Sequence, residues 1–140
     1  MIAGLLLMAA SAGAAHAHAD EQPINCGSCA KWNALHAPFK LHGNSYYVGV
    51  GGLSAVLITT PNGHFLIDGG LPQSAEVIKQ NIQALGFDVR DVEWLLNSHA
   101  HYDHAGGLAS LQRMSGAPIA ASSKTLKALE LGHALPDDPQ

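Results

Sequence analysis

The sequence predicts an α/β fold in which helices cover a mixed sheet. Short runs rich in β-branched and aromatic residues alternate with segments whose apolar residues have helical spacing, as in sheets covered by helices. A histidine-rich cluster directly follows one predicted strand, which is where open α/β sheets place their ligands. The chain has 140 residues, of which 47% are hydrophobic, and no linker divides it, so we expect one domain.

Residues 1–19 are predicted to form a secretory signal peptide rather than part of that domain. The apolar block Ile2–Ala10 is followed by small residues and by two triplets that fit a cleavage site, Ala15–Ala17 and Ala17–Ala19. No lysine or arginine precedes the block, so an N-terminal helical element is the alternative. The block is too short to span a membrane. We therefore expect a periplasmic or secreted protein, without a membrane span, whose mature domain occupies residues 20–140.

Cys26 and Cys29 lie in a Cys-Gly-Ser-Cys sequence near the expected start of the mature chain. An oxidising compartment favours a short-loop disulfide between them, and two near-surface thiols are the alternative. A thioredoxin-like role is disfavoured, because that motif belongs to a βαβ unit. The segment Cys29–His42 is expected to be irregular, since its apolar residues show no sustained periodicity.

Three strands joined by tight turns are predicted in the first half of the mature chain. They are rich in β-branched and aromatic residues and comprise Ser45–Val50, Leu53–Thr60 and His64–Asp68. The Asn62-Gly63 turn predicts antiparallel pairing of the second strand with the third. Asp68 ends the third strand, where its carboxylate can either cap a turn or face a cleft.

Helices and strands alternate in the remainder of the chain. Pro72–Leu85 carries one apolar stripe and is followed by Gly86, which predicts a helix lying on the sheet. Val92–Asn97 has a continuous apolar centre, typical of a strand covered on both faces. Three further elements are expected: a helix over Ala105–Met114, a strand at Pro118–Ala121, and a helix that Ser122 or Ser123 caps and that ends near Leu131.

The densest group of ligand-type side chains follows Val92–Asn97 and comprises His99, His101, Asp103 and His104. Imidazole and carboxylate ligands suit zinc and similar ions. His99 and His101 are two residues apart, so in an extended loop both can hold one ion. Asp103 and His104 follow on the turn into the next helix, close enough to hold a second ion, and two such ions can share a hydroxide. A histidine-rich surface turn is disfavoured by the density of the cluster, and a structural zinc site by its lack of cysteine.

The motif His99-x-His101-x-Asp103-His104 after an apolar strand resembles the signature of the metallo-β-lactamase superfamily. Three blocks around it are similar to the third subclass of its zinc β-lactamases: Gly52–Ile58, Leu66–Ala75 and Asn97–Leu108. The resemblance implies an αβ/βα sandwich built from two similar halves. This chain corresponds to the N-terminal half, and the C-terminal half is expected to be missing.

The resemblance also implies a zinc-dependent β-lactamase, a hydrolase linked to antibiotic resistance, in which metal-bound hydroxide attacks the β-lactam carbonyl. His99 and His101 would bind the first zinc, and Asp103 and His104 the second, with two ions in a complete site. Asp103 would also act in catalysis by orienting the hydroxide. Asp68 would support the metal loop from outside the set of ligands.

Two other functions remain open at this point. The first alternative is another hydrolase of the superfamily, such as a thioesterase or a lactonase, and the second is a catalytically inactive zinc-binding fragment. The expected partner is a small-molecule substrate, a β-lactam, because a formal net charge of −4 and the absence of a basic face disfavour nucleic acid. A half-sandwich would expose an apolar sheet face, so self-association of the truncated form is expected.

Overall fold

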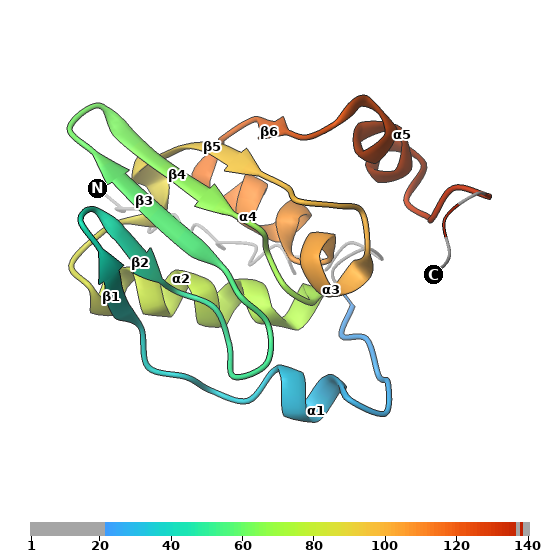
Figure 1. Ribbon diagram of the computed structural model, residues 1–140, viewed down its shortest axis with the longest axis horizontal. Helices are drawn as coiled ribbons and strands as arrows, with labels where there is room; N and C mark the ends of the chain where they lie inside the picture. The colour runs from blue at the N-terminus through green and yellow to red at the C-terminus, as the bar shows by residue number, and fades with distance from the viewer. Residues whose placement is uncertain (1–21, 137, 139–140) are drawn as a thin grey trace, which may run out of the picture.

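The computed structural model describes residues 22–136 and residue 138 (Figure 1). The predicted signal peptide, residues 1–19, therefore lies outside the described residues. The strands form one six-stranded sheet in the order β1-β2-β3-β4-β5-β6. Their bounds are β1 Phe39–His42, β2 Ser45–Tyr47, β3 Val56–Thr60, β4 Gly63–Ile67, β5 Val92–Leu96 and β6 Ile119–Ala120.

The sheet is mixed, as the sequence predicts. Strands β1 to β4 form an antiparallel meander, and Thr60 faces Gly63 across the expected β3–β4 hairpin. Strands β4, β5 and β6 are parallel to one another. Because parallel strands end at the same edge of a sheet, the residues that follow β4 and β5 are brought together there.

Helices connect the strands and include several short turns. The helical elements are α1 Cys29–Trp32, a 3₁₀ turn Pro72–Ser74 that leads into α2 Ala75–Ala84, a 3₁₀ turn Val89–Asp91, α3 Tyr102–Ala105, α4 Leu108–Ser115 and α5 Ser123–Leu131. The helix expected over Ala105–Met114 is present as α4, but it begins at Leu108 and not at Ala105. Ala105 ends the separate helix α3, because the Gly107 amide donates to the Gly70 carbonyl at 3.1 Å rather than continuing that helix.

The hydrophobic core lies between one face of the sheet and helices α2 and α4 (Figure 1). Leu57, Leu66 and Leu95 are neighbours in register on β3, β4 and β5, and all three are fully buried. The helix residues packed in the same cluster are Ile78 and Ile82 of α2 and Leu108 and Leu111 of α4. Burial of each such side chain contributes roughly 1.5 to 3 kcal/mol, so this layer fixes the sheet under the loops of the site.

The opposite face of the sheet is apolar and incompletely covered by the described residues. Trp94 of β5 pairs with Phe65 of β4 on this face and is 43% exposed. Phe39 and Leu41 of β1 are exposed as well. The prediction that β5 is covered on both faces is therefore wrong, because the apolar run of β5 meets the helices on one side only.

The segment before β2 is more regular than expected. The prediction that Cys29–His42 is irregular is wrong, because it contains α1 and β1. All four residues of β1 are exposed, so this edge strand lacks the alternation that marks a half-buried strand. A disulfide joins Cys26 to Cys29, and Cys29 is buried against Val50 and Leu53. Among the described residues, no helix is long and apolar enough to cross a membrane.

Candidate metal centre

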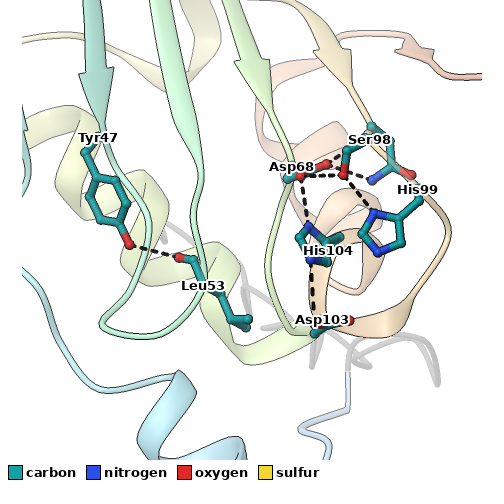
Figure 2. A network of polar contacts seen from close by, with 8 residues as sticks. Tyr47, Leu53, Asp68, Ser98, His99, Asp103 and His104 are labelled. Atoms are coloured by element: carbon teal, nitrogen blue, oxygen red, sulfur yellow. Dashed lines mark hydrogen bonds and ion pairs between the residues drawn. The ribbon is translucent and has the colours of Figure 1, made fainter. Parts of the chain in front are cut away.

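The candidate site lies where the parallel strands β4 and β5 end. Asp68 follows β4, and its amide donates to the Leu96 carbonyl of β5 at 2.9 Å. Asn97, Ser98 and His99 follow β5 and lie beside Asp68 (Figure 2). The chain then turns through His101 into α3, which carries Asp103 and His104. The two strand ends therefore deliver the support and the ligand-type residues to one edge of the sheet.

The Asp68 carboxylate accepts several hydrogen bonds at this edge of the sheet. Its Oδ1 accepts hydrogen bonds from the Asn97 amide group at 3.0 Å and the Ser98 backbone N–H at 2.8 Å. Its Oδ2 accepts from the Ser98 hydroxyl at 2.7 Å and from His104 Nδ1 at 3.0 Å. The residue is buried and has a φ of 61°, a left-handed conformation that aspartate tolerates better than most residues.

Two glycines allow the chain between α3 and α4 to lie close to the loop after β4. Gly107 lies between the two helices and Gly69 lies in the loop. The Gly69 amide donates to the His104 carbonyl at 2.8 Å, which ties this loop to α3. A Cβ atom on Gly107 would lie 2.2 Å from the Gly69 carbonyl oxygen, so only glycine allows the two backbones to approach this closely. The contact sets the position of His104 relative to Asp68.

His99, Asp103 and His104 form the one group of metal-ligand type found among the described residues. One ligand atom from each lies within 4.8 Å of the others. The ring centroids of His99 and His104 are 4.1 Å apart, and His104 Nε2 lies 3.6 Å from Asp103 Oδ2. Asp103 Oδ1 is buried and has no hydrogen-bond partner among the described residues. A buried, unpaired carboxylate oxygen beside two imidazoles is a donor set that fits zinc.

His101 lies next to this group but is engaged elsewhere. Its ring centroid is 4.6 Å from that of His99, yet its Nε2 contacts Asp138 Oδ1 at 2.9 Å. The sequence pairs His99 with His101 and Asp103 with His104, whereas the structure groups His99 with Asp103 and His104. The assignment of individual ligands to two ions stays a prediction.

Burial lowers the pKa of His99 below the ordinary imidazole value. The neighbouring imidazoles of His104 and His101 lower it further, and the carboxylates of Asp68 and Asp103 oppose the shift. A lowered pKa favours the neutral ring, which is the form that binds a metal ion. The electrostatics of His99 therefore suit a ligand.

Sequence reasoning missed three residues that contact the predicted ligands or Asp68. Asn97 and Ser98 lie in the sequence block that drew attention to the cluster, and a short polar side chain after a strand is a usable signal for such a contact. Asp138 gives no such signal, because it is 37 residues from His101 in the chain. Only the folded structure brings it to the site.

The fold and site together define an α/β protein with a candidate metal centre at the ends of parallel strands. The family model described as the metallo-beta-lactamase superfamily matches residues 48–139. The chain belongs to this superfamily, as its motif indicates.

Solved structures of the superfamily match the chain closely. The Rm3 metallo-beta-lactamase is 60% identical with a TM-score of 0.81, over 84% of this chain and 44% of that enzyme. MEM-A1, a subclass B3 metallo-beta-lactamase from a soil metagenome library, is 55% identical with a TM-score of 0.77, over 78% of this chain and 41% of that enzyme. The chain thus spans less than half the length of these relatives.

A curated relative has a different activity. The N-acyl homoserine lactonase AttM of Rhizobium radiobacter is 35% identical in an alignment that covers 37% of this chain and 28% of the lactonase. The similarity is lower and shorter than that to the two β-lactamases.

Proposed function

We propose that this chain is the N-terminal part of a zinc-dependent β-lactam hydrolase. The observation that carries the proposal is the group of His99, Asp103 and His104, in which one buried carboxylate oxygen lacks a partner in the described part of the chain. Identities of 60% and 55% to two metallo-β-lactamases support the substrate class. The β-lactamase would contribute to antibiotic resistance.

Four residues of this chain would hold two zinc ions in the complete site. His99 and His101 would bind the first ion, and Asp103 and His104 the second. Bound zinc supplies a nucleophile from water at neutral pH and polarises the carbonyl that is attacked. The rest of the ligand set would come from outside this chain.

The chain's own groups orient the reacting partners. Asp103 Oδ1 accepts no hydrogen bond from residues 22–136 or 138, so it can accept a proton of the attacking water and direct its lone pair. Asp68 can only accept hydrogen bonds while ionised, so His104 must donate through Nδ1–H. His104 Nε2 is then left with its lone pair toward Asp103.

Export to the periplasm or outside the cell is part of the proposal. The signal peptide proposed at residues 1–19 would direct it. A disulfide such as that between Cys26 and Cys29 persists in an oxidising compartment, which supports this location.

The alternative function is lactone hydrolysis, which the similarity to the N-acyl homoserine lactonase favours. Both reactions need attack by water on a carbonyl, so the site geometry described above serves either. The higher identity to the β-lactamases supports a β-lactam as the preferred proposal.

A direct comparison of substrates tests the proposal. The gene product that contains this chain is assayed with zinc on a chromogenic cephalosporin and on an N-acyl homoserine lactone. We expect turnover of the cephalosporin and a loss of at least about 100-fold with Asp103→Asn, because the variant removes a positioned acid–base group. Asp91→Asn, an exposed site with the same charge change, should keep the activity. Lactone turnover without cephalosporin turnover would contradict the proposal.

The same assay on the 140-residue chain addresses the inactive-fragment alternative. We expect this chain to bind zinc but to lack measurable turnover, because it spans less than half the length of the similar β-lactamases. Turnover equal to that of the longer product would show that the remaining ligands are not needed.

A further inference from the structure

The Ser98 hydroxyl bridges a buried carboxylate and a predicted metal ligand. It lies 2.7 Å from Asp68 Oδ2 and 3.0 Å from His99 Nδ1 (Figure 2). We propose that Ser98 is a positioning residue. Its hydroxyl donates to the Asp68 carboxylate and accepts from His99, and this fixes the tautomer of His99. The inference rests on the proposed function, because it concerns the same metal-binding histidines.

Proton counting gives the direction of both hydrogen bonds. The Asp68 carboxylate has no proton, so the contact with Ser98 Oγ requires the single hydroxyl proton of Ser98. The hydroxyl can then only accept from His99, which must carry its proton on Nδ1. The lone pair of His99 is left on Nε2, the atom that remains to bind a metal ion.

The backbone holds Ser98 in the orientation in which its hydroxyl contacts both Asp68 and His99. Its amide donates to Asp68 Oδ1 at 2.8 Å, so main chain and side chain are both tied to one carboxylate. Asp68 also accepts from His104 Nδ1. One buried carboxylate therefore sets the tautomers of two imidazoles, that of His104 directly and that of His99 through Ser98. Outer partners of this kind tune metal affinity by orienting the ligands.

The test compares tautomers in the metal-free 140-residue chain. Nitrogen-15 NMR of the imidazole rings, at mildly alkaline pH, is recorded for the parent chain, Ser98→Ala, Ser98→Thr and the exposed control Ser123→Ala. We expect the Nδ1–H tautomer for His99 in the parent, and its loss in Ser98→Ala. Ser98→Thr should restore it, because threonine keeps the hydroxyl. Ser98 is exposed, so its truncation opens no core cavity.

Zinc affinity is the second readout. Ser98→Ala should weaken zinc binding by about 10- to 100-fold, with Ser98→Thr and Ser123→Ala near the parent value. An Nε2–H tautomer for His99 in the parent, or an unchanged tautomer in Ser98→Ala, would overturn the inference. The NMR readout needs neither zinc nor turnover. If the zinc-loaded gene product that contains this chain fails to hydrolyse β-lactams, the proposed function is refuted and the role of Ser98 is still decided by the NMR spectra.

A separate contact carries a second inference, which rests on the same proposed function. Asp138 Oδ1 lies 2.9 Å from His101 Nε2, and the Asp138 side chain is only 17% exposed. A carboxylate accepts, so His101 donates through Nε2–H and keeps its lone pair on Nδ1. We infer that Asp138 is the positioning residue of His101, which turns Nδ1 rather than Nε2 toward a metal ion.

The same spectra test this second assignment. Asp138→Ala should remove the Nε2–H tautomer of His101 and leave His99 unchanged, whereas Ser98→Ala should do the reverse. Asp138→Glu should restore the His101 tautomer by keeping a carboxylate, and the exposed control Asp91→Asn should change neither ring. An Nδ1–H tautomer for His101 in the parent, or no response to Asp138→Ala, would exclude this role.

Discussion

Asp68 shows how a single residue joins the fold to the site. All four groups that contact its carboxylate are hydrogen-bond donors: the Asn97 amide group, the Ser98 backbone N–H, the Ser98 hydroxyl and His104 Nδ1. An asparagine could keep the two bonds to Oδ1, but its NH₂ group would meet Ser98 Oγ and His104 Nδ1 only if both became acceptors. The carboxylate of Asp68 therefore sets the direction of these two hydrogen bonds and the tautomer of His104.

Replacing Asp68 by asparagine tests this role of the carboxylate. We expect Asp68→Asn to lower the free energy of unfolding by about 2 to 3 kcal/mol, because buried donors lose a charged acceptor. The measurement is urea denaturation at neutral pH. Asp91→Asn, which removes an exposed charge, should leave the unfolding free energy within about 0.5 kcal/mol of the parent value. Equal effects of the two variants would show that Asp68 acts only through its charge at long range.

The Asp88–Arg90 pair, which lies on the surface, makes a contribution to stability that depends on pH. Hydrogen bonds from the Arg90 side chain and backbone lower the pKa of Asp88 from 3.8 to about 2. The ionised form is favoured in the folded state, so the contribution to stability is complete above pH 3.8 and is lost as the pH falls toward 2. In Arg90→Ala, NMR titration of the Asp88 carboxyl should give a pKa closer to 3.8. An unchanged value would contradict the assigned cause.

At the scale of elements, the contact between the α3–α4 junction and the loop after β4 positions the residues that are proposed to bind metal. Gly107→Ala puts a Cβ atom 2.2 Å from the Gly69 carbonyl oxygen. Forcing the two backbones apart should cost about 1 to 3 kcal/mol of unfolding free energy and should also weaken zinc binding. The control is Gly27→Ala, whose added methyl group meets no atom within 4 Å. Thermal unfolding and zinc titration that do not distinguish the two variants would argue against this role for Gly107.

The elements that the sequence predicts well are those with one buried face. The residues Leu57, Leu66 and Leu95 give β3, β4 and β5 their apolar centres, and the apolar stripe of α2 is equally regular. Strand β1 lacks such a pattern because all its residues are exposed. The break between α3 and α4 escaped notice because it depends on a hydrogen bond from Gly107 to Gly70, a contact between distant segments.

In the candidate site, too, the sequence predicts the residues that are close together in the chain but not the contacts that depend on the tertiary fold. His99, His101, Asp103 and His104 are close in sequence, so their spacing alone reveals a cluster of ligand-type groups. The grouping within the cluster depends on how the loop and α3 pack, which spacing does not define. Asp138 reaches His101 only through the tertiary fold, and no local pattern in the sequence could have indicated it.

At the scale of the whole molecule, the apolar sheet face around Trp94 is the feature that the described residues leave open. We expect the 140-residue chain to associate with a second copy through this face, because exposed apolar sheet surface is costly in water. Sedimentation velocity over a range of concentrations should show dimers or larger species. Trp94→Ser should weaken the association. Leu35→Ser, at an 81% exposed apolar residue outside the sheet, should not. A monomer at every concentration would contradict the expectation.

We propose that the ends of β4 and β5 assemble a metal centre from His99, Asp103 and His104. The most direct test is an anomalous difference map, collected at the zinc absorption edge from crystals of the zinc-loaded chain. We expect an anomalous peak bonded to at least two of these three side chains, with Asp68 still hydrogen-bonded to His104. A map in which zinc binds only elsewhere in the chain, with this group free of metal, would contradict it.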